Sequence, residues 1–179
     1  KTYAVTSISE RAFYSSSKLN TVTLPNSMKT LENKAFEWCG ITSITIPGSV
    51  TSIGSQAFNL CHDLISVTIS DGVTSISNSM FLSCDSLTSV SIPATVTSIG
   101  NYAFSGCSSL ASIDIPNTVT TIGSNAFSGC SSLTSVNIPD GVVSIGAYAF
   151  NNCTNLASVS IPNSVTEFGT DAFSGCTQI

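Results

Sequence analysis

Phenylalanine recurs along this chain at an almost constant interval, and this interval constrains the fold more than any other feature. Eight phenylalanines are separated by 22 or 23 residues: Phe13, Phe36, Phe58, Phe81, Phe104, Phe127, Phe150 and Phe173. A constant interval of this kind indicates an array of structural repeats that stack on one another. Such arrays usually present a surface for binding rather than an enzyme active site.

Each repeat contains a short segment that ends in proline and alternates apolar with polar residues. In the repeat that follows Phe104, this segment is Ile113-Asp114-Ile115-Pro116. The alternation predicts a strand with one buried face, and proline ends it because proline has no N–H to donate. Six repeats have proline at this position, and the seventh has Ser70 followed by Asp71-Gly72. A period in the low twenties, with one strand per repeat, is typical of leucine-rich repeats.

The rest of the repeat returns the chain to the start of the next strand. A second extended stretch, of the type Val-Thr-Ser-Ile-Gly, precedes the pattern Ala-Phe-x-x-Cys, whose spacing of three fits one or two helical turns. We therefore expect a repeat solenoid, a right-handed leucine-rich-repeat coil. Each repeat of ~23 residues should hold one short parallel strand and a helical or extended return segment.

We expect residues 1–179 to form a single solenoid of about eight repeats, with both ends in the middle of a repeat. A solenoid end without a polar cap exposes its apolar column. This arrangement predicts either a segment of a longer array or an end that a partner covers.

The seven cysteines also follow the repeat, because each lies three residues after a repeat phenylalanine. Equivalent side chains on stacked coils point in parallel, which suits neither a disulfide nor a tetrahedral metal site. The first repeat has Ser16 in place of cysteine, which a small core position tolerates. We therefore expect free thiols in the core.

Charged residues are few and unevenly placed. All five basic residues lie in the first 34 positions: Lys1, Arg11, Lys18, Lys29 and Lys34. Nucleic acids and anionic membranes need clustered Lys and Arg, so the later repeats are poorly suited to bind them. No apolar run approaches the length of a membrane span.

Catalytic and metal-binding patterns are absent from the sequence. The single histidine, His62, has no nucleophile partner that spacing would assign to it, and the acidic residues are scattered. No calcium loop and no phosphate-binding glycine loop occurs. We predict no enzyme activity, no metal and no cofactor.

The strand motif Leu-x-x-Val-x-Ile-Pro and the return motif Ile-Gly-x-x-Ala-Phe-x-x-Cys closely resemble the BspA-like leucine-rich repeat family of bacterial and protist surface proteins. The resemblance covers nearly the whole chain. Departures from the family pattern are small. Ile41 stands one residue early after Cys39, Met80 replaces the alanine before Phe81, and Phe168 replaces the repeat isoleucine. The resemblance implies an extracellular or cell-surface protein that acts in adhesion or in binding host and matrix components. A cytoplasmic location stays open.

Two surfaces are candidate binding sites. The first is the row of outward strand positions, which we call the strand-face ladder: Thr45, Thr68, Ser91, Asp114, Asn137 and Ser160. It suits a neutral polar ligand such as a glycan or a protein backbone, although short hydroxylated side chains also simply suit solvated strands.

The second surface, which we call the flank patch, consists of larger residues at positions that are otherwise small or polar: Trp38, Leu60, His62, Ile65 and Leu82. Apolar side chains on neighbouring coils can merge into a contact surface, or they can fold over the flank of the column.

These features predict a non-catalytic adhesion module that binds a protein or a neutral glycan, without a nucleic-acid partner or a membrane span. The alternative is a structural spacer or scaffold that self-associates through its uncapped ends. Ice binding is a remote third reading. Rows such as Thr21-Val22-Thr23 are similar to flat hydroxyl arrays, but the curvature of a leucine-rich solenoid and the mixed Ser, Asp and Asn side chains argue against it.

Overall fold

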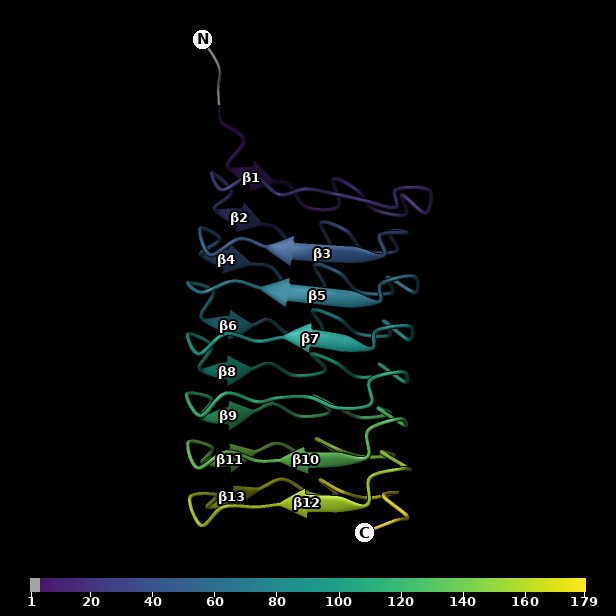
Figure 1. Ribbon diagram of the computed structural model, residues 1–179, viewed down its shortest axis with the longest axis vertical. Coiled ribbons are helices and arrows are strands. Elements are labelled where there is room, and N and C mark those ends of the chain that lie inside the picture. The colour runs from purple at the N-terminus through teal and green to yellow at the C-terminus, as the bar shows by residue number, and fades with distance from the viewer. Residues whose placement is uncertain (1–3) are drawn as a thin grey trace.

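The chain folds as one column of stacked coils with strands on two opposite sides. The computed structural model describes residues 4–179, so Lys1 lies outside the described residues. Figure 1 shows two sets of arrows that run across the column in opposite directions. One set comprises β3 (Ser43–Ile46), β5 (Ser66–Ile69), β7 (Ser89–Ser91), β10 (Ser135–Asn137) and β12 (Ser158–Ser160). The outer side of this set is called the strand face below.

The other set comprises shorter strands, each of two residues: β1 (Ser7–Ile8), β2 (Thr30–Leu31), β4 (Ser52–Ile53), β6 (Ser75–Ile76), β8 (Ser98–Ile99), β9 (Thr121–Ile122), β11 (Ser144–Ile145) and β13 (Glu167–Phe168). All strand pairs are parallel and join equivalent positions of neighbouring coils. The expected repeat solenoid is confirmed, and each complete coil carries a second short strand in its extended return.

The strands of the strand face form where apolar and polar residues alternate. In β3, Ile44 and Ile46 are buried whereas Ser43 and Thr45 are exposed, and Pro47 follows directly. Two coils lack the expected strand. Thr21 makes a single bridge with Ser43, and residues 112–115 form no strand, so the sheet β3-β5-β7 and the sheet β10-β12 are separate.

A shortened corner accompanies the weak pairing of the first coil with β3. Only Gly40 separates Cys39 from Ile41, one residue fewer than in the later coils. A Cβ atom at Gly40 would lie 2.1 Å from the Ser17 carbonyl oxygen, so the two coils are in very close contact at this corner. Beyond the Thr21–Ser43 bridge, the first coil and β3 separate.

The helical alternative for the return segment is wrong, because residues 4–179 contain no helix. Tyr102 and Gly106 have φ values of 56° and 75°, in the left-handed region that interrupts an α-helix. Alternate N–H groups also point to the next coil instead of back along the segment. Those of Tyr102, Phe104 and Gly106 donate to the carbonyls of Ser124, Ala126 and Ser128 at 2.9, 2.8 and 2.7 Å. The segment is therefore a series of tight turns bonded to its neighbour.

The eight repeat phenylalanines form one continuous stack along the core. Successive ring centroids lie 5.0–5.7 Å apart, with ring planes within 17° of parallel. The six rings from Phe36 to Phe150 are fully buried. These centroid distances lie within the range of favourable aromatic pairs, and the stack joins every coil to the next.

The cysteines line the core beside this stack, as expected for free thiols. All seven are free; Cys176 is partly buried and the other six are buried. The Cys84 thiol donates to the Phe58 carbonyl oxygen at 3.2 Å, and Cys107 repeats this bond to Phe81. Each thiol thus satisfies a carbonyl of the preceding coil.

Candidate binding surfaces

The strand-face ladder is solvent-exposed along the whole column. Thr45, Thr68, Ser91, Asp114, Asn137 and Ser160 are all exposed, and Thr23 extends the row into the first coil. Asp114 is the single charged member. Hydroxyl and amide groups can donate and accept hydrogen bonds, so this face can bind an uncharged polar partner.

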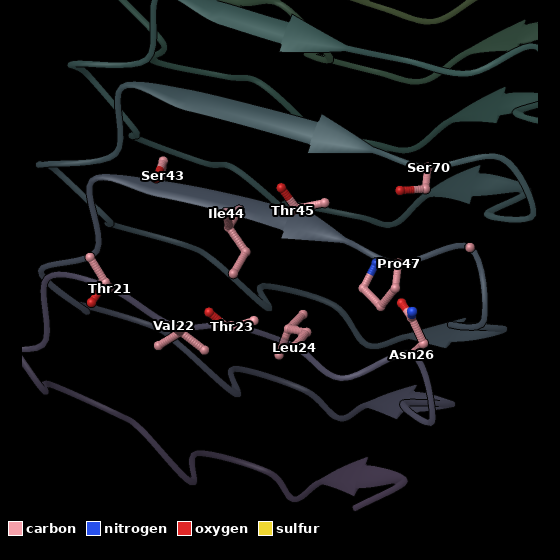
Figure 2. A pocket seen from close by; sticks show the side chains of 11 residues that line it. Thr21, Val22, Thr23, Leu24, Asn26, Ser43, Ile44, Thr45, Pro47 and Ser70 are labelled. Atoms are coloured by element: carbon pink, nitrogen blue, oxygen red, sulfur yellow. The ribbon is translucent and has the colours of Figure 1, made fainter.

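A cleft of about 590 Å³ opens in the strand face between the first coil and β3. Figure 2 shows the segment from Thr21 to Leu24 running beneath β3, with the side chain of Ile44 between them. The lining residues are uncharged: Thr21, Val22, Thr23, Leu24, Asn26, Ser43, Ile44, Thr45, Pro47, Gly48 and Ser70. Thr45 is the member of the ladder that reaches this cleft, and the other predicted ladder residues lie beyond it.

The flank patch is only partly brought together. Trp38, Leu60 and His62 line a hollow of about 120 Å³ with Ser17, Cys39, Gly40 and Asp63. Ile65 and Leu82 do not line this hollow. Ile65 is 50% exposed at the corner before β5, and Leu82 is half-buried.

Trp38 and Leu60 project from left-handed backbone positions, with φ values of 60° and 59°. The later coils place Gly106, Gly129 and Gly175 at the equivalent position. A left-handed conformation is energetically unfavourable for a residue with a Cβ atom. Trp38 does not offset this cost by full burial, because it is 51% exposed. The hollow beside Trp38 is therefore not a product of core packing.

His62 contacts Asp85 at the surface of the column. Its Nδ1 lies 2.9 Å from Asp85 Oδ1, and both side chains are 53% exposed. The neighbouring Cys61 thiol donates to the Phe36 carbonyl, and burial raises the pKa of this thiol to about 12. A neutral buried thiol is a poor nucleophile, so the pair does not form a reactive dyad.

Beneath the flank lies a buried polar pair that the sequence did not single out. Asn59 Nδ2 donates to Glu37 Oε1 at 2.7 Å, and Lys34 Nζ lies 3.8 Å from Glu37 Oε2. Asn59 Oδ1 has no hydrogen-bond partner. The sequence does contain a sign of this pair. The residue that follows the repeat phenylalanine is Glu37 or Asn59 in these coils, whereas later coils have Ser105 and Ser128 at the same position.

Within residues 4–179, no three His, Cys, Asp or Glu side chains come together in a way that could hold a metal ion. Over the same residues, no helix has the length and apolarity needed to cross a membrane.

The family model for the BspA type leucine rich repeat region matches residues 2–110 and 74–179, with six copies. The chain belongs to this family. Its expected architecture of short coils with a strand, a proline corner and a phenylalanine core is the one described above. No curated protein matches the chain.

Solved structures of bacterial repeat proteins are similar to this BspA-type chain. A leucine-rich repeat protein of T. pallidum is 34% identical, with a TM-score of 0.82 over 88% of this chain and 77% of its own. A leucine rich cell surface protein of Faecalibacterium prausnitzii is 33% identical, with a TM-score of 0.67. The match covers 98% of this chain and 56% of the Faecalibacterium protein. A leucine-rich repeat protein of Eubacterium ventriosum is 26% identical, with a TM-score of 0.69, over 96% of this chain and 40% of its own.

Proposed function

We propose that this chain is a non-catalytic adhesion module of a bacterial surface protein, and that its strand face binds an uncharged region of a protein or a neutral glycan. The observation that carries the proposal is the strand face itself. It presents an exposed row of side chains from Thr45 to Ser160, all hydroxyl or amide except Asp114, that runs into an uncharged cleft. Repeat solenoids commonly use such extended faces for binding.

Two further observations support this reading. The chain has no Lys or Arg after Lys34, so a phosphate-rich partner has no counter-charge along most of the column. The similar Faecalibacterium protein is described as a cell surface protein, which supports an extracellular location. The flank patch is the second candidate surface, because Trp38 is exposed and tryptophan is frequent among residues that dominate binding energy.

Bead adhesion tests the proposal and separates the two surfaces. Beads coated with the chain would be applied to immobilised extracellular-matrix proteins and to neutral glycans. One variant carries Thr45→Lys, Ser91→Lys and Asn137→Lys on the strand face, and a second carries Trp38→Ser and Leu60→Ser on the flank. We expect the strand-face variant to lose adhesion at least tenfold, because three ammonium groups would have to be desolvated at the contact.

The matched control carries the same charge on the opposite side of the column. Ser52, Ser75 and Thr121 are exposed outward positions of the short strands, and their replacement by Lys should leave adhesion unchanged. Loss in the flank variant alone would move the site to the flank patch. Full adhesion in both variants, with folding intact, would contradict both surfaces and favour the spacer or self-assembly alternative.

A further inference from the structure

The cleft in the strand face exposes backbone groups that a parallel sheet would normally pair. In a parallel ladder, alternate residues of a strand bond to the neighbour on one side and then to the neighbour on the other. The carbonyl of Ile46 accepts the N–H of Ser70, so Ile46 and Ile44 face β5. Ser43 instead bridges Thr21. The N–H and C=O of Thr45 must therefore face the first coil.

The partners that Thr45 should have on the first coil are not bonded to it. A continued ladder would place the Thr45 N–H on the Val22 carbonyl and the Leu24 N–H on the Thr45 carbonyl. Neither bond is present between residues 21–24 and β3, where Thr21–Ser43 is the only pairing. Two donors and two acceptors thus line the cleft at strand spacing.

The local sequence does not explain this gap through poor strand propensity. Thr21-Val22-Thr23-Leu24 has the same alternation as β3, and β-branched residues favour strands. The inner members remain apolar, because Leu24 and Ile44 are 8% and 3% exposed and Val22 is half-buried. The floor of the cleft is therefore apolar, and hydroxyl side chains lie along it (Figure 2). The backbone groups described above lie along the same cleft without a partner on the facing coil.

The charge of the cleft restricts what can occupy it. None of its lining residues is charged, so a charged occupant would be desolvated without a counter-ion. N–H and C=O groups that alternate at strand spacing match the backbone of an extended polypeptide. The volume of about 590 Å³ lies within the range of ligand-binding clefts.

We propose that this cleft binds an extended, uncharged segment of a partner polypeptide, which adds its backbone to the free edge of β3 at Thr45. The inference rests on the proposed binding function of the strand face and specifies the class of partner. The bound segment alternates small apolar residues, which cover Val22 and Ile44, with uncharged polar residues that point outward. A proline at the position that donates to Thr45 prevents binding, because proline has no N–H.

The probe is a fluorescein-labelled, end-capped hexapeptide with the sequence of residues 65–70, since β5 within this range already pairs with the other edge of β3. Binding to the intact chain is followed by fluorescence anisotropy. A second hexapeptide is N-methylated at its two central residues, which removes donors and leaves the side chains unchanged. We expect saturable binding of the first peptide and at least tenfold weaker binding of the second, about the effect of one lost hydrogen bond with an unpaired acceptor.

Variants of the chain locate the contact. Thr23→Trp places a large ring in the cleft and should weaken peptide binding at least tenfold. The matched control, Asn137→Trp, alters an equally outward position on β10 and should leave affinity within about twofold. The N-methylated peptide is tested on the unaltered chain. The inference can therefore still be contradicted if Thr23→Trp fails to fold.

Three results would overturn the inference: no peptide binding up to millimolar concentration, equal binding of the N-methylated peptide, or equal binding by Thr23→Trp. Binding of a neutral oligosaccharide such as maltotetraose in place of the peptide would also overturn it. If coated beads adhere but the peptide does not bind, the adhesion function stands and the peptide inference fails. If the peptide binds but beads do not adhere, the inference stands and the adhesion function fails.

Discussion

At the scale of single residues, the cysteines show how one side chain joins two coils. The Cys107 thiol donates to the Phe81 carbonyl, and the same oxygen accepts the Cys84 N–H at 3.2 Å. Burial, with a smaller contribution from neighbouring thiols, raises the pKa of Cys107 well above its ordinary value. A neutral thiol with a hydrogen-bond acceptor fits the core, so the repeat cysteines are structural.

Alkaline pH should weaken the fold through these thiols. Burial raises the pKa of Cys61 and Cys153 from 9.0 to about 12. Between these values the unfolded chain loses thiol protons that the folded chain retains, so the free energy of unfolding falls as pH rises. The contribution of these thiols to the free energy of unfolding is fully present below pH 9. Each such thiol should lower the folding equilibrium constant about tenfold per pH unit in this window, measured as a falling urea midpoint under reducing conditions.

A double variant, Cys61→Ala with Cys153→Ala, isolates the thiol contribution to this pH dependence. Its midpoint should be lower near pH 8, because two buried thiols are removed, but it should fall less steeply above pH 9. Identical slopes for the double variant and the parent chain would contradict the explanation.

At the scale of elements, the return turns depend on residues that adopt a left-handed conformation. The position two residues after each repeat phenylalanine has positive φ in every coil, for example Ser83 at 57° and Gly129 at 74°. From this position the backbone N–H donates to the next coil, as Ser83 does to Ser105 O at 2.7 Å. Residue type at this position therefore tunes stability without changing the core.

Glycine at Ser83 should stabilise the chain. Ser83→Gly removes a Cβ from a left-handed position and should raise the free energy of unfolding by about 0.5–1 kcal/mol. The matched control is Ser105→Gly, at a position without positive φ, where glycine should destabilise by about 0.5–1 kcal/mol because it adds only unfolded-state freedom. Both are measured by chemical denaturation. A loss of stability in Ser83→Gly equal to that of Ser105→Gly would show that the left-handed angle carries no strain.

The sequence predicted the strands of the strand face better than the return. Alternation of polar and apolar residues, such as Ser-Ile-Thr-Ile before Pro47, indicates a strand with one buried face, and β3 forms there. Both a helix and a series of tight turns would give the spacing of three around Phe104. The two structures differ in their hydrogen bonds, because only the tight turns donate to the next coil. The helix alternative failed because those bonds are long-range.

The two candidate surfaces were predicted to different extents, because residues share a face of the column only when they occupy the same position of the repeat. The ladder followed directly from strand alternation, and its members are exposed. The flank patch combined residues at different offsets from the repeat phenylalanine. Trp38 and Leu60 follow it by two residues, Leu82 by one and Ile65 by seven, so the coil directs them to different places. The cleft was not predicted, because a repeat pattern implies that neighbouring strands pair.

At the scale of the whole molecule, the interactions that hold residues 4–179 together run from each coil to the next. The strand pairs, the phenylalanine stack and the thiol bonds each join one coil to the next. The stability of such an array is close to a sum of coil and interface terms. The effect of a core substitution should therefore depend on where along the column it is made.

Phe104→Ala tests this dependence at the centre of the stack. Its ring is fully buried, with centroids 5.4 and 5.3 Å from those of Phe81 and Phe127, so truncation should cost about 3–5 kcal/mol. Amide hydrogen exchange should lose protection mainly between residues 81 and 127, because the interfaces on either side weaken while more distant coils keep theirs. Phe173→Ala, at a partly buried ring with a single neighbour in the repeat stack, should cost less and act only near that end of the column. Equal loss of protection from residue 4 to residue 179 in the Phe104→Ala chain would show instead that the column unfolds as one cooperative unit.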